Sequence, residues 1–511
     1  MTGPNGVRVA DLLSALSLTT DLGSGVPFEK GLRTCVAATA FAEALDLGLT
    51  DRRAVFHASL LRAIGCTAHA PENAAMFADD VLFQRALKTL DPADPETFAA
   101  RFGDWAGARQ PELLALVIDK TPTVGVYAAR SSCEVSSALG TRLGISPEAI
   151  VALKEVYERW DGRGIPDGRA GEELTLVARV VHVAEQAVLA HAEAGEIGAR
   201  RELARRAGGH LDPGLCAAFA VHAEAVFASL SNEDMLSAVL AAEPPPIAMV
   251  NAANLSDLCL ALAIFADLKG VHLVGHSTRV AELAGGAGKL LGMDVDALGD
   301  LRAAALLHDL GRTGVSSEIW DRPGPLGPGD QERVRLHSHW TERILGRSPA
   351  LAPLAQVAAA HHERLDGSGY HRRPGAGELS LAARTLAAAD VFSAMTEDRA
   401  YRRAFAREDA ARAVLAEAAA GRLDPAATAA VIEAAGLPRR PTAWPCELTG
   451  REVEVLRLCA RGLTNREIAK ALFLSARTVQ HHLGSVYDKT GRRTRAGAAV
   501  FAVEHGLLGA E

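Results

Sequence analysis

The chain has 511 residues, of which 49% are hydrophobic and 23% are charged, and its formal net charge is −8. This composition is typical of a globular protein, and the length indicates about three domains rather than one undivided fold. Aromatic residues make up only 5% of the chain, which argues against a β-sandwich and favours helices that pack through small side chains. We therefore expect an all-α protein.

Two proline-rich stretches, at 244–246 and 436–445, divide the chain. Because proline resists helix formation and stiffens linkers, these stretches predict three domains, at residues 1–240, 249–435 and 446–511. The N-terminus has no basic and apolar leader, and the longest apolar window, 258–268, is too short to span a bilayer. These features predict a cytoplasmic protein that does not contact a membrane.

The first two segments resemble each other. Residues 157–185 and 362–390 align without a gap at an offset of 205, with 11 identities in 29 positions. That agreement exceeds chance in an alanine-rich chain, and apolar residues recur at helical spacing in both segments. We interpret the two segments as an internal duplication of one helical bundle.

Histidines concentrate in the second segment, where eight of the 17 lie between 272 and 371. A single buried histidine is usually a hydrogen-bonded core residue. Several imidazoles together with Asp309 and Asp390 in one helical core are instead a typical donor set for divalent transition metals. Consecutive helical residues point about 100° apart, so His308 and Asp309 suit a pair of ions bridged by the aspartate.

These residues resemble, in chain order, the HD-GYP subgroup of HD-type phosphohydrolases. The matching motifs are His276-Ser277-x-Arg279, His308-Asp309, His337, His361-His362-Glu363-x-x-Asp366-Gly367-x-Gly369-Tyr370, Asp390, and Asp398-Arg399-x-Tyr401-Arg402. The resemblance implies a helical bundle that holds two or three metal ions, usually iron or manganese, and hydrolyses cyclic di-GMP. It assigns His276, His308, Asp309 and Asp390 to one metal, and Asp309, His337, His361 and His362 to the other.

The resemblance also implies roles beyond the metal ligands. Asp309 and Arg312 become catalytic residues, and the residues expected to contact substrate are Arg312, Arg364, Asp366, Gly367, Gly369 and Tyr370. Three positions depart from the family pattern. Arg312 replaces a lysine, His371 replaces the proline of the GYP motif, and His272 is either a ligand for a third metal or a surface histidine.

The first segment has lost these ligands. Extending the duplication outward places Leu60–Gly65 opposite the HD motif. The positions equivalent to the seven ligands are then approximately Leu32, Arg62, Ala63, Ser132, Val156, Tyr157 and Glu185. Since only Glu185 is a potential metal ligand, the segment predicts a degenerate HD domain that acts either as a packing or dimerisation partner or as a sensory pocket for a nucleotide or another small molecule.

The C-terminal segment, 446–511, has 10 basic and 7 acidic residues, so a basic module is hidden in the acidic total. Capping boxes at Thr449 and Thr464 and an N-cap at Ser475 mark helix starts. The helix from Ala476 to about Lys489 buries an apolar face and leaves a polar face outward. This pattern predicts a helix-turn-helix.

The same segment closely resembles the LuxR-type DNA-binding domain, which implies that the helix from Ala476 enters the major groove. Gln480 and His481 are then near base edges, and basic side chains meet phosphates. The predicted DNA-binding residues are Arg477, Thr478, Gln480, His481, Lys489, Arg492, Arg493 and Arg495.

Both resemblances together predict two tandem HD-type bundles followed by a helix-turn-helix domain. We expect a cytoplasmic, homodimeric transcriptional regulator that couples double-stranded DNA binding to a metal-dependent domain that binds a nucleotide or cyclic di-GMP. Two alternatives stay open. One is a phosphodiesterase with a secondary DNA-binding tail, and the other is a non-catalytic scaffold with a structural metal site.

Overall fold

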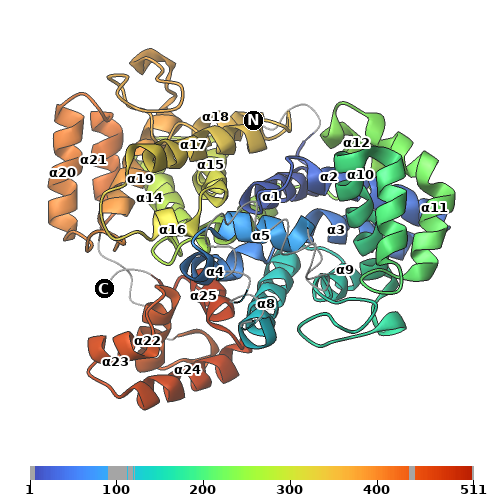
Figure 1. Cartoon of the computed structure of the whole chain (residues 1–511). Coiled ribbons are helices and arrows are strands. Elements are labelled where there is room, and N and C mark those ends of the chain that lie inside the picture. Colours follow the sequence, from blue (N-terminus) through green and yellow to red (C-terminus); the bar gives the residue numbers. More distant parts are fainter. Residues whose placement is uncertain are drawn as a thin grey trace. The chain divides into compact units, whose positions relative to one another are not determined.

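A computed structural model of the chain describes residues 6–89, 121–436 and 444–508, together with positions 112, 115 and 119. Its elements are helices, and across these described ranges the only extended pairings are four isolated β-bridges (Figure 1). The prediction of an all-α fold is confirmed. Pro438 and Pro441, in the second predicted linker, lie outside the described residues.

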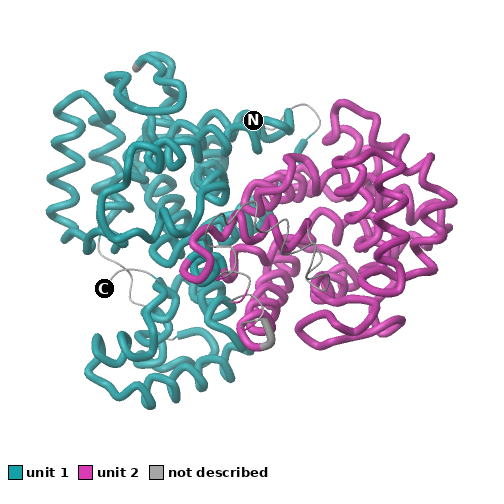
Figure 2. The backbone as a smooth tube through the Cα atoms, viewed as in Figure 1, with its two compact units in different colours: residues 1–7, 70–74, 251–511 teal, residues 8–69, 75–250 magenta. Residues whose placement is uncertain are grey.

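The chain forms two compact units (Figure 2). Unit 1 comprises residues 1–7, 70–74 and 251–511, and unit 2 comprises residues 8–69 and 75–250. The break at 250/251 lies four residues after the proline-rich stretch at 244–246 and two residues inside the predicted second domain. The three-domain boundaries drawn from the proline-rich stretches stay a prediction.

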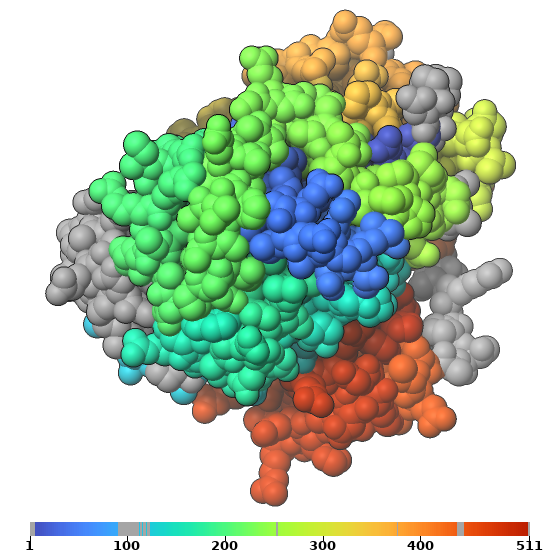
Figure 3. Space-filling view, turned by 90° about the vertical axis from the view of Figure 1, so that its right-hand side faces the viewer, coloured from blue at the N-terminus to red at the C-terminus, as the bar shows by residue number. Residues whose placement is uncertain are grey.

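Unit 2 is a bundle in which helices distant in sequence pack on one another. Its helices are α1 (Val9–Gly23), α2 (Lys30–Ala44), α3 (Leu49–Leu61), α5 (Asp80–Thr89), α8 (Val126–Arg142), α9 (Pro147–Leu153), α10 (Leu176–Arg206), α11 (Pro213–Ala228) and α12 (Met235–Ala242), while α4 (Ala70–Phe77) crosses the boundary between the units. Helix α2 contacts α3, α10, α11 and α12. On the face of unit 2 in Figure 3, the blue N-terminal segment lies between the green and teal segments.

Unit 1 contains a second bundle and the C-terminal helices. The bundle consists of α13 (Ala252–Asp267), α14 (His276–Leu290), α15 (Val295–Leu307), η6 (Leu310–Gly314), α16 (Ser317–Trp320), α17 (Pro328–Leu345), α18 (Ala352–Ala358), α19 (Leu381–Met395), α20 (Arg407–Ala419) and α21 (Pro425–Ala434). Helix α14 packs against α15, α19 and α21, and α17 packs against η6 and α18. These contacts bring the histidine-bearing segments together.

The two bundles repeat the same helices, as the duplication predicted. Helices α2 and α14 are both 15 residues long, and α3 and α15 are both 13 residues long. Helices α2 and α14 begin 246 residues apart, as do α3 and α15, whereas α10 and α19 begin 205 residues apart. The offset changes because the two copies differ in the connections between these pairs.

The helix starts correct one equivalence drawn from the sequence. Leu32 was paired with His276, but the true counterpart is Lys30. Both α2 and α14 begin directly after a residue in the left-handed region, Glu29 (φ 71°) and Gly275 (φ 80°). The first copy has no recognisable motif near Lys30. The sequence alone therefore does not fix the alignment of this helix with α14 to better than two residues.

Buried aspartates support the same register. The Gly31 backbone N–H donates to Oδ2 of Asp21 (2.8 Å), and the Ser277 N–H donates to Oδ2 of Asp267 (3.0 Å). Asp21 precedes Gly31 by ten residues, and Asp267 precedes Ser277 by the same distance. The entry into the helix is therefore built in the same way in both copies.

One glycine in each copy allows a close backbone approach. A Cβ atom at Gly311 would lie 2.0 Å from the carbonyl oxygen of His337, and one at Gly65 would lie 2.3 Å from that of Ser132. Only glycine fits at such a distance. This contact fixes the segment after the HD motif against the helix that carries His337, and its twin in unit 2 confirms that Ser132 corresponds to His337.

The C-terminal helices are α22 (Gly450–Ala460), α23 (Asn465–Ala471), α24 (Ala476–Thr490) and α25 (Arg495–Glu504). The capping boxes predicted at Thr449 and Thr464 are both present, and the Ser475 hydroxyl accepts from the Thr478 backbone N–H. On α24 the side chains of Val479, Leu483 and Val486 are buried. The predicted helix-turn-helix pattern is therefore present.

One helical stretch, Pro213–Ser231, is long and apolar enough to cross a membrane by length and composition alone. It contains α11, which packs on α2 and α10 within unit 2. Phe219 and Val226 on this helix are buried, whereas Val221 is 77% exposed. Core helices of globular bundles meet the same criterion, so this feature is weak evidence for a membrane span.

Candidate functional site

The predicted metal ligands of unit 1 come from helix ends and helix faces that converge in its core. His276 begins α14, His308 caps the C-terminus of α15, Asp309 precedes η6, His337 lies in α17, His361 and His362 follow α18, and Asp390 lies in α19. All except His362 are at most 2% exposed, and His362 is half-buried. The structure therefore brings all seven residues together.

Asp309 lies between two sets of imidazoles. Its Oδ2 is 2.9 Å from Nε2 of His308 and 3.6 Å from Nε2 of His276. Its Oδ1 is 3.5 Å from Nε2 of both His337 and His361. One carboxylate thus offers a separate oxygen to each side of the cluster, which is the arrangement expected of a bridging ligand.

Three of the histidines are oriented by backbone carbonyls. Nδ1 of His308, His337 and His361 lies 2.7, 2.5 and 2.7 Å from the carbonyl oxygen three residues earlier in the chain. Because a carbonyl oxygen only accepts, each Nδ1 carries the proton and donates. Each Nε2 is therefore left to face the centre of the cluster, which is the usual arrangement of metal-binding histidines.

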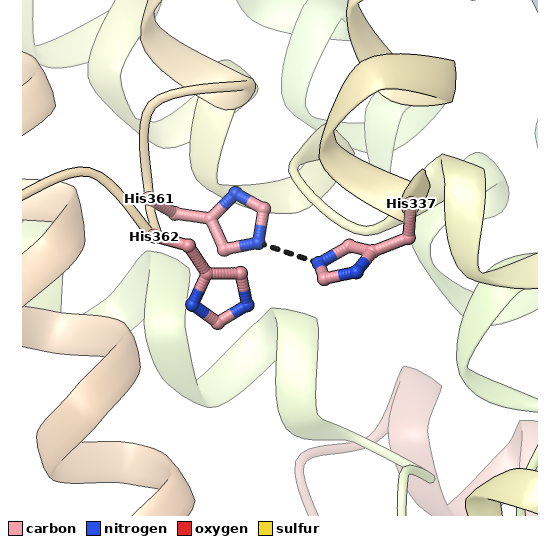
Figure 4. A group of neighbouring side chains, drawn as sticks. All are labelled: His337, His361 and His362. Carbon is pink, nitrogen blue, oxygen red and sulfur yellow. Dashed lines mark hydrogen bonds between the residues drawn. The ribbon is translucent and has the colours of Figure 1, made fainter. Parts of the chain in front are cut away.

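His337 and His361 approach each other closely with the ring nitrogens that face the centre of the cluster (Figure 4). Their Nε2 atoms are 3.0 Å apart. Burial lowers the pKa of His337 to about 4 and that of His361 well below its usual range, so both rings are neutral near pH 7. Two lone pairs then face each other across 3.0 Å. A divalent ion beside them would turn this repulsion into coordination.

The donor atoms also group as metal sites require. His337, His361 and His362 form one group, His276, His308 and Asp390 a second, and His308, Asp309 and His361 a third, each with its ligand atoms within 4.8 Å of one another. Among the described residues, both oxygens of Asp309 and Nε2 of His308 are buried without a well-aligned hydrogen bond. The residues present therefore fit a metal centre.

The sequence analysis missed Glu397, which supports this centre. Its Oε2 lies 2.9 Å from Nδ1 of His276, and its Oε1 accepts hydrogen bonds from Nε of Arg279 (2.8 Å) and the Ser393 hydroxyl (2.6 Å). The Arg399 guanidinium is 3.0 Å from the same carboxylate. Glu397 directly precedes the Asp398-Arg399-x-Tyr401-Arg402 motif of the resemblance, and its acidic character was the available signal.

Arg312 is buried beside the cluster. Its Nη1 lies 2.8 Å from Oδ2 of Asp309, and its guanidinium stacks over the Trp320 ring at 5.2 Å from the ring centroid. The indole Nε1 of Trp320 donates to the Arg312 carbonyl (3.2 Å). The planar guanidinium that replaces the family's lysine is thus held by an aromatic face, which a lysine would use less well.

The loop after His362 is shaped by its own hydrogen bonds. Asp366 is exposed and accepts from the Ser368 N–H (2.9 Å), Gly367 has φ 75°, and a Cβ atom at Gly369 would lie 2.6 Å from Cα of Glu363. For these loop residues the structure shows a role in shaping the turn, and substrate contact stays a prediction.

Three further side chains of this loop have identified contacts. The Tyr370 ring is 4.6 Å from that of His362, and Arg364 donates to the Glu363 carbonyl (2.8 Å). His371, at the position of the family's proline, adopts φ 95° and pairs with Glu342. Tyr370 and Arg364 therefore both contact predicted metal ligands, Tyr370 through the His362 ring and Arg364 through the His361 carbonyl (3.3 Å).

His272 is not part of the donor groups formed by the described residues. It is half-buried, and its carbonyl accepts from Nη1 of Arg399 (3.0 Å). Burial and the nearby Arg399 charge lower the pKa of its imidazole. A third metal at this histidine stays a prediction.

The predicted DNA-binding residues fall into two groups. Arg477, Gln480, His481 and Arg493 are exposed, whereas Thr478 is half-buried and hydrogen-bonds to Ser475. The other three side chains have partners within the domain: Lys489 with Glu452 (2.8 Å), Arg492 with Glu504 (3.1 Å), and Arg495 with Asn465 (3.1 Å). The first group is the better placed for DNA.

Comparison with known proteins finds a matching family for the region of the predicted metal ligands and another for the C-terminal domain. The family model for the HD domain matches residues 261–427, and that for bacterial regulatory proteins of the luxR family matches residues 447–502. The 3′3′-cGAMP-specific phosphodiesterase 3 of Vibrio cholerae is 30% identical over 450 residues, which cover 85% of this chain and 96% of that protein. A match of this length includes parts of both units.

Two further similarities are informative. A cyclic di-GMP phosphodiesterase of Thermotoga maritima is 34% identical over 164 residues, or 32% of this chain and 44% of that protein. A crystal structure of a cyclic GMP-AMP specific phosphodiesterase from V. cholerae aligns with a TM-score of 0.59 at 24% identity, covering 85% of this chain and 99% of that one. The second similarity shows that the fold is shared.

Proposed function

Because this chain belongs to the HD-GYP type of HD-domain phosphodiesterases and carries a LuxR-type DNA-binding domain, we propose that it is a metal-dependent cyclic-dinucleotide phosphodiesterase that also regulates transcription. The observation that carries the enzymatic part is the pair of facing lone pairs on His337 and His361 beside the bridging Asp309. We propose two divalent ions, iron or manganese, as the resident metals, and a cytoplasmic location.

The chemistry follows from the groups around the cluster. Two bound ions would activate a water molecule and neutralise charge on a phosphodiester. Asp309 would offer one carboxylate oxygen to each ion, and Arg312 places a permanent positive charge 2.8 Å from its Oδ2. Such a charge stabilises the negative charge that develops on phosphate oxygens. Tyr370, whose ring is 4.6 Å from that of His362, offers an aromatic face beside the predicted ligands.

The substrate class is proposed from the relatives, whose names specify 3′3′-cGAMP and cyclic di-GMP. The test is hydrolysis of both dinucleotides by the full chain loaded with Mn²⁺ or Fe²⁺, followed by chromatography. Asp309→Ala should abolish turnover. Absence of turnover of either substrate by protein that contains its full metal complement would refute the enzymatic part and favour a structural metal site.

The regulatory part is proposed from the exposed polar face of α24, where Arg477, Gln480 and His481 are accessible. Helix-turn-helix domains usually bind two half-sites as dimers, so we propose a homodimer on double-stranded DNA. The test is the affinity for promoter DNA, measured by fluorescence anisotropy with and without cyclic di-GMP. An affinity that neither nucleotide nor His361→Ala changes would leave the phosphodiesterase with a secondary DNA-binding tail.

A further inference from the structure

In unit 2, charged side chains take the positions of three predicted metal ligands of unit 1. By the register of the helices, Lys30 takes the place of His276, Arg62 that of His308, and Glu185 that of Asp390. Lys30 begins α2, Arg62 caps the C-terminus of α3, and Glu185 lies in α10. We call Lys30, Arg62 and Glu185 the first-copy site.

The first-copy site is one connected ion cluster. Nζ of Lys30 donates to Oε1 of Glu185 at 2.6 Å, and Nε of Arg62 donates to its Oε2. The second nitrogen, Nη2 of Arg62, donates to the Val156 carbonyl (3.2 Å), at the position equivalent to His361. The Lys30 and Glu185 side chains are 5% and 4% exposed, whereas 13% of the Arg62 side chain reaches solvent. The cluster therefore has access to the surface through Arg62.

The charges around this cluster do not balance. Lys88, whose Nζ donates to the Ser24 hydroxyl (2.7 Å), adds a third cation. Glu185 and Asp21 supply two carboxylates. Burial, with a contribution from the Lys30 charge, lowers the pKa of Lys88 to about 8. Three cations thus share two carboxylates, so an anion beside these cations would be attracted by the excess positive charge.

A histidine one turn before Glu185 on α10 adds a second polar group that a bound anion could satisfy. Nε2 of His182 is buried and has no hydrogen-bond partner among the described residues. His182 precedes Glu185 by three residues, so the two share one face of the helix, and it lies within electrostatic reach of Arg62. Its counterpart in the second copy is Ala387. The first copy therefore has a buried imidazole at the position where the second copy has an alanine methyl group.

From these observations we infer that the first-copy site binds the phosphate group of a nucleotide without metal, through Lys30 and Arg62. Two cationic side chains take the positions of two predicted metal ligands of the second copy, and Glu185 between them holds both side chains in place. The turn beside the site is also retained, because Glu158 accepts from backbone N–H groups as Glu363 does. The nucleotide part of the ligand rests on the proposed function, whereas the phosphate part rests on the cations.

The test uses the full chain with His308→Ala and Asp309→Ala, in EDTA, so that the second copy holds no metal. Calorimetry with GMP should show binding, and guanosine, which lacks the phosphate, should bind at least tenfold more weakly. Arg62→Met should weaken GMP binding by about tenfold or more, as expected for a lost charged hydrogen bond. This variant leaves Glu185 paired with Lys30, so it should fold.

A second variant removes the ion cluster as a unit. Lys30→Met and Arg62→Met together with Glu185→Leu delete all three charges of the first-copy site, which is the tolerated way to remove buried ion pairs, and this variant should also abolish GMP binding. GMP affinity that is equal in the parent and in both variants would overturn the inference, as would the absence of GMP binding to the parent. Hydrolysis by the metal-loaded wild-type chain is measured separately, so failure here leaves the enzymatic proposal intact.

Discussion

Glu397 Oε2 lies 2.9 Å from Nδ1 of His276, so a buried carboxylate sets the tautomer and the orientation of one predicted metal ligand. Supporting carboxylates of this kind typically change metal affinity about 10- to 100-fold. We expect Glu397→Ala to lower metal affinity by this amount, measured by competition with a chelating dye.

The matched control is Asp424→Asn. Asp424 also pairs with an arginine, Arg384, at 2.8 Å, but it touches no predicted ligand. The Asp424→Asn variant should have a lower unfolding free energy than the wild type and the same metal affinity. Equal metal affinity in Glu397→Ala and the wild type would show that backbone packing alone orients His276.

Arg312 should act on turnover rather than on metal content. We expect Arg312→Met to lower kcat/KM for cyclic di-GMP by about 100-fold, the usual loss when a charge-stabilising donor is removed. Arg312→Lys should retain more activity because it keeps the charge. Metal content per chain, measured by mass spectrometry, should stay unchanged in both variants. A loss of metal equal to the loss of activity would make Arg312 a structural partner of Asp309.

Gly311 and Gly65 offer a matched pair, because a Cβ atom at either would collide with a carbonyl oxygen. Each alanine variant should lose about 1–3 kcal/mol of unfolding free energy through overpacking. Gly311→Ala should also displace His337 and reduce metal binding, whereas Gly65→Ala should leave metal binding intact. Thermal unfolding and metal titration of both variants would show whether the effects separate.

Asp21 predicts a pH dependence of stability. Burial raises its pKa to about 6, above the ordinary value of 3.8. Below pH 3.8 the carboxyl is protonated in both states. Between pH 4 and 6 the unfolded chain loses its proton first, so the unfolding free energy falls as pH rises, by about 3 kcal/mol in total.

Asp21→Asn should remove this component. Relative to the wild type, the variant should gain stability between pH 4.5 and 7 in urea unfolding followed by circular dichroism. The exposed Asp46→Asn should show no such gain. A parallel pH dependence of wild type and Asp21→Asn would mean that Asp21 stays ionised in the folded chain throughout.

In the DNA-binding domain, the exposed and the paired cations should behave differently. Arg477→Ala and Arg493→Ala should each reduce the salt dependence of DNA binding by about one ion. Lys489→Met should instead destabilise the domain by about 1–3 kcal/mol, because the buried Glu452 carboxylate loses its cationic partner and keeps only its hydrogen bonds from Thr449 and Ser485. An unchanged salt slope for Arg477→Ala would remove it from the phosphate contacts.

Sequence reasoning succeeded where spacing and chemistry agree. The helix starts at Thr449, Thr464 and Ser475 follow from local capping, and the all-α fold follows from composition and periodicity. Long-range partners were harder to predict. Nothing in the sequence near Lys30 indicates that it meets Glu185, 155 residues away, and the contact of Glu397 with His276 spans 121 residues. Such pairs depend on how the helices pack, which periodicity alone does not specify.

The ion cluster of unit 2 has a consequence for how the protein responds to its surroundings. A core that is held together by bound metal ions depends on the supply of that metal. The positive charges of Lys30 and Arg62 are instead covalently part of the chain. We therefore expect iron or manganese starvation to loosen the core around His337 and His361 and to leave the core around Glu185 unchanged. One duplicated scaffold would then contain a half that depends on metal supply and a half that is independent of it.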